Sequence, residues 1–322
     1  MTDQHRVIPI FIPQRACPHR CTYCNQFTIA GQISVPTPEE AVRTIERHLA
    51  TMSANAEVRV GFFGGSFTGL SLAEQDAYLQ VVQPFIKSGQ VCSIQLSTRP
   101  DYISPAVLDL LKRRHVGIIE LGAQSLDDGI LAATHRGHTA AQVEEASGMI
   151  LKAGFQLGLQ MMIGLPGDTK EKAMGTAARI CELGATFTRI YPTLVVNDTL
   201  LAKQYEDGLY QPLALEEAVD WCKDLQLYFE AHHVQILRMG LHPSRQLLDG
   251  SGYLAGPFHV SFKELVLTAI WHDKIADIVR HSAGNPVEIE VPAGELNYAI
   301  GYGSANRKTF PEVKFKMRDK FL

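Results

Sequence analysis

Three cysteines lie close together near the start of the chain. Cys17, Cys21 and Cys24 stand in the string CPHRCTYCNQ as C-x-x-x-C-x-x-C, directly after the apolar run 7–12. Thiolates are soft ligands that suit iron–sulfur clusters, and a cubane 4Fe–4S cluster takes four of them. A trio of cysteines therefore leaves one iron without a protein ligand, and a substrate or cofactor can bind there.

Two other arrangements compete with the cluster. Zinc takes four ligands at tight spacing, so Cys17, His19, Cys21 and Cys24 could form a structural zinc site. A disulfide framework fits less well, because six cysteines in 322 residues are sparse and the opening segment MTDQHRVIPI lacks a signal peptide's apolar core. We therefore expect reduced thiols in a cytoplasmic protein. The other cysteines have no partner spacing and are predicted to be small buried hydrophobes: Cys92, Cys181 and Cys222.

The composition is that of a globular protein, with 46% hydrophobic and 20% charged residues. Its length allows one large α/β domain or two unequal domains. No apolar run approaches the roughly 18 to 20 residues that span a bilayer, so we expect no membrane partner. The formal net charge of -4 gives no overall attraction to phosphate backbones, and any contact with nucleic acid must be local.

Apolar strand-like runs alternate with helix-period segments, which is typical of parallel βα units. Thr37 is expected to cap the first long helix, with Pro38 at its first position. In such folds the working residues lie at the carboxyl ends of the strands. We predict strands over 7–12, 58–63, 91–96, 117–121, 155–163, 188–194 and 234–239, and helices over 37–52, 71–87, 104–113, 139–153, 169–183 and 215–231.

Short polar or glycine-containing motifs follow five of these strands. Paired glycines let a ligand approach the backbone closely, and hydroxyls, amides, carboxylates and a planar guanidinium supply specific polar contacts. Gln160 is a polar residue on an otherwise apolar strand, and a ligand in the interior is the main reason for that. Thr139 is expected to cap a helix together with Gln142. The candidate binding residues are Gly64, Gly65, Ser66, Ser97, Thr98, Glu120, Gln124, Arg136, Gln160 and Gly164.

The cysteine spacing, with Tyr23 just before the last cysteine, resembles the signature of the radical S-adenosylmethionine (SAM) enzymes. The resemblance implies an α/β fold, a partial (β/α)6-type TIM barrel, in which SAM chelates the open iron. It places Gly64 and Gly65 at the motif that binds the SAM amino group, with Ser66 in place of an acid, and Gly164 near the adenine. One electron then cleaves SAM to a 5'-deoxyadenosyl radical, which abstracts hydrogen from a substrate.

A narrower resemblance covers roughly residues 7 to 240. The strings FFGGSFTGL, LSTRPDYI, ELGAQSLDDGIL, RGHT, MMIGLPGDT and RIYPTLVVNDTLL are similar to the core shared by the catalytic subunit of Elongator and by oxygen-independent coproporphyrinogen oxidase-like proteins. The cysteine spacing is the compact one, unlike Elongator's, and we expect no acetyltransferase domain. The resemblance also implies a reductant such as flavodoxin or ferredoxin.

Residues 241–322 are expected to form a small α+β extension to a core of residues 1–240. We predict a helix over 261–281 and a strand over 287–291, and the segment 295–308 resembles the glycine loop of KH-type RNA-binding modules. The extension is interpreted as a lid or as an RNA- or substrate-binding segment, and its basic end as a solvated tail or a phosphate-contacting patch with Arg307, Lys308, Lys314 and Lys316. We therefore expect a structured RNA such as tRNA as substrate. The alternatives are a small molecule or peptide, or a non-catalytic iron–sulfur or zinc protein that binds RNA.

Overall fold

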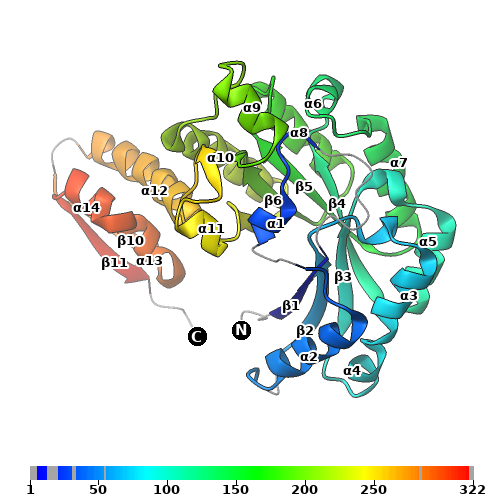
Figure 1. The fold of residues 1–322 in the computed structure, drawn as a ribbon. Coiled ribbons are helices and arrows are strands. Elements are labelled where there is room, and N and C mark those ends of the chain that lie inside the picture. Colours follow the sequence, from blue (N-terminus) through cyan, green and yellow to red (C-terminus); the bar gives the residue numbers. More distant parts are fainter. Residues whose placement is uncertain (1–5, 13–20, 31–33, 54–55, 283–284, 319–322) are drawn as a thin grey trace.

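A curved sheet of parallel strands forms the centre of the molecule (Figure 1). The computed structural model describes residues 6–12, 21–30, 34–53, 56–282 and 285–318, so Cys17 and His19 lie outside the described residues. Strands that follow one another in the sequence are neighbours in the sheet, as expected for successive βα units. Its seven strands, in spatial order, are β1 (Arg6–Phe11), β2 (Val58–Phe63), β3 (Ser93–Thr98), β4 (Val116–Gln124), β5 (Gln156–Ile163), β6 (Phe187–Pro192) and β8 (Gln235–Met239).

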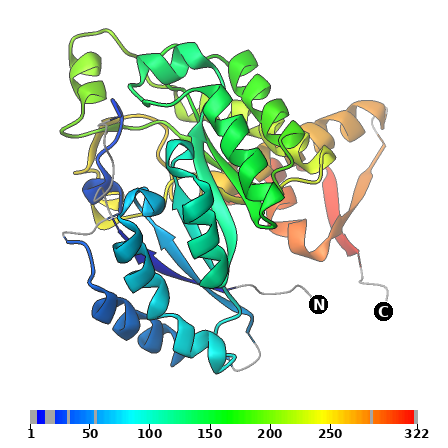
Figure 2. The same cartoon turned by 90° about the vertical axis from the view of Figure 1, so that its right-hand side faces the viewer.

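Helices lie on the outer side of the sheet and leave its inner side open (Figures 1 and 2). Both predicted caps are present: Thr139 forms the expected capping box with Gln142, and Thr37 caps its helix and also forms a capping box with Glu40, which was not predicted. The predicted helix over 71–87 is divided into two at residues 81–82. The covering helices are α2 (Pro38–Leu49), α3 (Leu72–Gln80), α4 (Gln83–Lys87), α5 (Pro105–Arg113), α7 (Ala140–Lys152), α8 (Lys170–Glu182) and α10 (Leu215–Ala231).

The strands separate an apolar outer face from a polar inner face. In β5, Leu157, Leu159 and Met161 are completely buried and belong to the main core, whereas Gln160 and Met162 are only partly buried and line the inner cavity. Side chains alternate along a strand, so one face packs on the helices while the other remains available for a ligand. The partial TIM barrel expected from the sequence is confirmed, with seven parallel strands.

Two short helices that we did not predict from the sequence bind the backbone between Cys21 and Cys24, which we call the cysteine loop. These are α6 (Asp128–Ala133) and α9 (Leu200–Glu206). The Thr22 amide donates to the Thr134 carbonyl at the end of α6 (3.0 Å), and the Leu201 amide at the start of α9 donates to the Thr22 carbonyl (2.8 Å). The backbone between Cys21 and Cys24 is therefore fixed from two sides.

The first part of the extension covers the helix that follows the cysteines, α1 (Gln26–Ala30). Ser244 Oγ donates to the Thr28 carbonyl (3.1 Å), and Leu247 and Tyr253 share an apolar cluster with Ile29. We call residues 241–258 the lid segment. It contains α11 (Arg245–Leu248) and β9 (Tyr253–Ala255), which pairs with β7 (Val195–Val196).

The rest of the extension packs beside α10, away from the sheet interior (Figures 1 and 2). Helix α12 (Phe262–His281) contributes Val266 to the main core and Ile275 to a second, smaller core. That smaller core lies against a parallel strand pair. The remaining elements are β10 (Val287–Pro292), α13 (Leu296–Ile300), α14 (Ala305–Thr309) and β11 (Val313–Arg318).

Two expectations for the end of the chain and for the cysteines are wrong. The basic end does not form a solvated tail over residues 313–318, because they form β11, where Lys316 and Arg318 face Glu288 and Glu290 at 3.8 and 3.6 Å. Cys92, directly before β3, is exposed, and Cys181 is only partly buried, whereas Cys222 is buried as predicted. Within the described residues no helix has the length and apolar character to cross a bilayer.

Candidate active site

A cavity of about 1130 Å³ occupies the inner side of the sheet. Inward-facing residues of all seven strands line it, from the amino ends, such as Arg59 and Gln156, to the carboxyl ends, such as Gln124. The described lining residues include six arginines and no aspartate or glutamate. The interior of the half-barrel is therefore hollow, and its charged lining residues are cationic.

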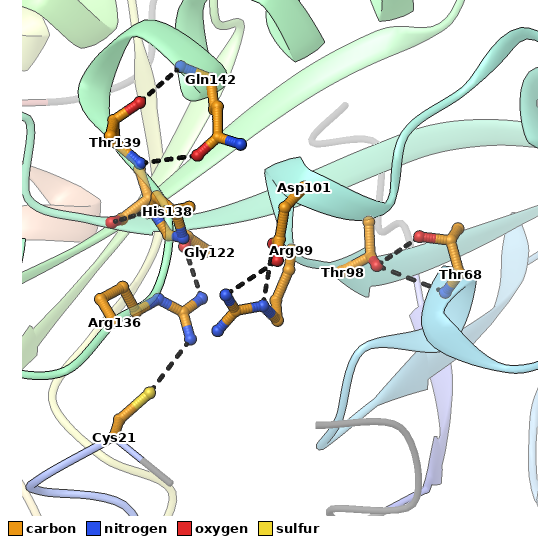
Figure 3. A network of polar contacts seen from close by, with 11 residues as sticks. Cys21, Thr68, Thr98, Arg99, Asp101, Gly122, Arg136, His138, Thr139 and Gln142 are labelled. Atoms are coloured by element: carbon orange, nitrogen blue, oxygen red, sulfur yellow. Dashed lines mark hydrogen bonds and ion pairs between the residues drawn. The ribbon is translucent and has the colours of Figure 1, made fainter. Parts of the chain in front are cut away.

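Cys21 and Cys24 lie at the carboxyl end of the sheet and both line this cavity. Cys21 is buried, and the Cys24 amide donates to its carbonyl at 3.1 Å. The Arg136 guanidinium donates through Nη1 to Cys21 Sγ at 3.4 Å (Figure 3). A neighbouring cation stabilises a thiolate, which is the form that binds metal. Two soft donors beside a buried guanidinium fit an iron–sulfur cluster, whose third predicted ligand, Cys17, lies outside the described residues.

Arg136 is held in the interior at the end of β4. It is 8% exposed, and its Nη2 donates to the Gly122 carbonyl at 2.7 Å. A Cβ at Gly122 would lie 2.9 Å from that nitrogen, so the glycine makes room for the guanidinium. Burial lowers the pKa of Arg136, but Tyr23 and the cysteine thiols outweigh it and raise the pKa, which keeps the side chain charged.

A second buried arginine lies beside Arg136. Arg99 is 2% exposed and makes a bidentate ion pair with Asp101 (2.9 and 3.0 Å), which neutralises its charge (Figure 3). Nearby, His138 Nε2 contacts the Ala123 carbonyl at 3.3 Å. Burial, together with the charges of Arg136 and Arg99, lowers the pKa of His138 to about 3, so this imidazole is neutral.

Most of the other predicted binding residues surround the same end of the cavity. Gly64 has a φ of +102° and packs against the Ile12 backbone, which explains the need for glycine there. Thr98 Oγ1 lies 2.6 Å from Thr68 Oγ1, so this hydroxyl also ties β3 to the following loop (Figure 3). The predicted residues that line the cavity are Gly64, Gly65, Ser66, Ser97, Thr98, Gln124, Arg136 and Gln160.

Gln124 adopts an unusual backbone conformation at the end of β4. Its φ is +66°, and the register with β5 shifts between Gly122 and Gln124. Its Oε1 is buried and has no hydrogen-bond partner within the described residues. Left-handed conformations of non-glycine residues are costly and concentrate at functional sites. An unpaired acceptor on such a residue fits the contact with a polar ligand group that the sequence predicts.

Glu120 and Gly164 do not line the cavity. Glu120 is completely buried, and its carboxylate accepts hydrogen bonds from Gln95 (3.1 Å), Gln160 (3.0 Å) and Arg189 (2.5 and 3.0 Å). A direct contact with SAM would displace one of these donors. Gly164 has a φ of +71° and its amide donates to Asp168 (2.9 Å), which closes the turn after β5. The ligand contacts of all ten residues stay predictions.

A second polar group lies across the cavity, on β6 and β8, and the sequence did not single it out. Arg189 reaches across from β6, and its guanidinium carbon lies 5.3 Å from the centre of the Phe63 ring on β2. Arg238 Nη2 lies 3.3 Å from His242 Nδ1. We call Arg189, Tyr191, Arg238 and His242 the β6–β8 wall, and the residues opposite it, around Cys21, Gly64, Ser97 and Arg136, the β1–β4 wall.

A family model of the radical SAM superfamily matches residues 11–180, over half of the chain, and a radical SAM C-terminal domain matches residues 185–271. The chain belongs to the radical SAM superfamily. It is therefore a radical SAM enzyme, and a 4Fe–4S cluster and SAM are its cofactors. Radical SAM enzymes also need a reductant.

The chain is similar in sequence to two curated proteins, among others. Protein YhcC of Escherichia coli K12 is 25% identical over 214 residues, which is 63% of this chain and 68% of that protein. The tRNA uridine(34) acetyltransferase of Dehalococcoides mccartyi is 25% identical over 233 residues, 61% of this chain and 50% of that protein. The chain thus spans only half the length of the second relative.

Solved structures show the same fold. Elp3 of the archaeon Methanocaldococcus infernus has a TM-score of 0.67 at 18% identity, covering 85% of this chain and 64% of that one. The coproporphyrinogen III oxidase HemN of Escherichia coli, a radical SAM enzyme, has a TM-score of 0.51 at 17% identity, covering 71% of this chain and 52% of that one. At these identities the likeness concerns the fold alone, and it agrees with the partial barrel.

Proposed function

We propose that this radical SAM enzyme modifies a nucleotide of a structured RNA, with tRNA as the first candidate. The observation that carries the proposal is the cavity, which is lined by six arginines and, among its described residues, by no carboxylate. Asp101 and Glu120 neutralise two of these arginines, Arg99 and Arg189, from behind the lining. The attraction for phosphate therefore rests on the others, and Arg238 is one of them. The chain has a net charge of -4, so this attraction is confined to the site.

The size of the cavity supports the proposal. Pockets for drug-sized ligands measure about 300 to 1,000 Å³, and this one measures about 1130 Å³. SAM on the β1–β4 wall therefore leaves room for part of a substrate. A whole RNA cannot enter, but an unpaired or flipped nucleotide can, at a cost of a few kcal/mol for unstacking. The relative named tRNA uridine(34) acetyltransferase adds support for tRNA.

The chain's own residues would then divide the work. The three cysteines hold the cluster, Arg136 donates to one of their sulfurs, and Gly64 and Gly65 leave space for SAM beside the backbone. When bound, the cluster and SAM supply the 5'-deoxyadenosyl radical, after one electron has come from a donor such as flavodoxin or ferredoxin. The β6–β8 wall faces this position and orients the substrate.

The extension takes part through its lid segment. We propose residues 1–240 as the catalytic core and residues 241–322 as the extension, joined by α12, which packs in both cores. The lid segment contacts α1 through Ser244 and helps to exclude water from the cavity. The parallel pair of β10 and β11 lies farther from the cavity (Figure 1).

The test is an anaerobic assay of SAM cleavage. Reconstituted enzyme, SAM and a reductant are incubated with bulk tRNA, with the same tRNA digested to nucleosides, or with a small-molecule extract. We expect intact tRNA alone to raise 5'-deoxyadenosine formation severalfold and to yield a nucleoside of altered mass. Stimulation by the extract but not by tRNA would contradict the proposal and point to a small molecule in the barrel.

A further inference from the structure

The β6–β8 wall combines four polar side chains that no predicted SAM contact uses. We propose that it binds a phosphodiester group of the substrate nucleotide, an inference that rests on the proposed function and assigns a place to one part of the substrate. All four residues line the cavity, opposite the β1–β4 wall. Arg189, Tyr191, Arg238 and His242 come from two neighbouring strands and the loop after the second.

Arg189 is fixed before any ligand arrives. Its Nε and Nη2 donate to Glu120, its guanidinium lies over the Phe63 ring, and it interacts with the Tyr191 hydroxyl. Glu120 is completely buried and takes two further donors, from Gln95 and Gln160. A guanidinium with no freedom to turn loses little entropy when it binds an anion, so the wall is preorganised.

Arg238 carries the one positive charge in the β6–β8 wall that no described carboxylate neutralises. Glu120 neutralises Arg189, but within the described residues no carboxylate forms an ion pair with Arg238. Its contact is His242 Nδ1, at 3.3 Å. Because Nδ1 accepts from the guanidinium, the ring proton lies on Nε2, where it remains available as a donor. Burial and Arg238 lower the pKa of His242, so the ring stays neutral.

The net charge and the hydrogen-bond donors of the wall match those that a phosphodiester group needs. The wall offers one net positive charge, from Arg238, together with neutral donors on Tyr191 and His242. A phosphodiester carries one negative charge and two free oxygens that accept hydrogen bonds, and protein contacts to nucleic-acid phosphates use the same donor types. A carboxylate has the same charge, so the experiment must separate these two anions.

The experiment measures binding of bulk tRNA to the reconstituted enzyme with SAM, as a function of salt. Arg238→Gln removes one charge from the wall, and we expect about tenfold weaker binding and a salt slope smaller by about one. His242→Ala should weaken binding less, without a change of slope. The matched control is Arg280→Gln, which removes the same charge from an exposed position on α12 and should leave binding unchanged.

Two outcomes separate this inference from the proposed function. If the wild type binds tRNA and Arg238→Gln binds it with the same affinity and slope, the wall is not the phosphate site, and the proposed function stands. If the wild type does not bind tRNA, the proposed function fails, and the wall is tested with the dinucleotide UpU, which carries one phosphodiester, against uridine and acetate. Binding of UpU in preference to both, abolished by Arg238→Gln, supports a phosphodiester site, whereas equal binding of uridine or of acetate overturns it.

Discussion

The two walls of the cavity are built in different ways. The β1–β4 wall consists largely of loops and strand ends, where we expect backbone, glycines and cysteines to contact the cofactors, and its residues lie in short strings along the sequence. Three members of the β6–β8 wall project from within strands and are separated from one another by apolar residues, and the fourth, His242, follows β8. Under the proposed assignment, the cofactors are bound mainly by loops and the substrate mainly by side chains within strands. Changes in one wall should therefore leave the other largely intact.

The largest effect should come from the cysteine loop. Cys24→Ala removes one of three thiolates, so anaerobic protein should lose most of the roughly four iron and four sulfide per chain that the wild type carries. The exposed Cys92 provides the control, since Cys92→Ala should retain both. Iron and sulfide analysis of the two variants checks this. Stoichiometric zinc without sulfide in the wild type would contradict a cluster at these cysteines.

Glu120 should stabilise the β6–β8 wall, because its carboxylate pairs with the Arg189 guanidinium. Glu120→Ala leaves a buried guanidinium unpaired, and we expect a loss of about 3 to 5 kcal/mol in the free energy of unfolding. Urea denaturation measures it. Glu290→Ala breaks an exposed ion pair with Arg318 and should cost less than about 1 kcal/mol. Equal costs for the two variants would show that the buried pair does not support the wall.

A substitution at Gly65 should weaken the binding of SAM and leave the cluster in place. Gly65→Val adds a branched side chain on the cavity surface and should weaken SAM binding by about 1 to 3 kcal/mol, up to about a hundredfold, with the cluster retained. Arg136→Ala should weaken it less. The readout is the change that SAM produces in the EPR spectrum of the reduced cluster. Unchanged SAM affinity in both variants would mean that SAM lies elsewhere, and altered affinity in Arg238→Gln would show that the walls are coupled.

His138 should give the β1–β4 wall a pH-dependent stability. Its pKa is about 3 in the folded chain and about 6.5 when unfolded, so protonation favours unfolding. The stabilisation is complete above pH 6.5 and declines as the pH falls, by about 2 kcal/mol at pH 5. Urea denaturation of the wild type and His138→Gln at pH 7 and pH 5 tests this. A decline of the same size in both proteins would assign it to other groups.

The sequence predicted the fold well because the alternation of strands and helices follows from periodicity. All seven strands of the main sheet were located within a few residues, and the cysteine trio and the glycine pair were identified from contiguous motifs. Arg189 and Arg238 were missed because a single arginine in a strand shows neither its inward direction nor its partner. Arg238 lines the cavity next to Leu237 because the register between β6 and β8 shifts there, which the sequence does not show. The partner of Arg189, Glu120, is 69 positions away in the sequence.

The hydrogen bond between Ser244 and Thr28 joins the lid segment to the helix that directly follows the cysteine loop. If this contact couples the placement of the lid segment to the binding of the cluster, each of the two stabilises the other by the same free energy. Whatever stabilises the lid segment in this position should therefore raise the affinity of the chain for its cluster, and a bound cluster should stabilise the lid segment to the same extent. A substrate that docks against the lid segment would thereby protect the cluster that is needed to transform it.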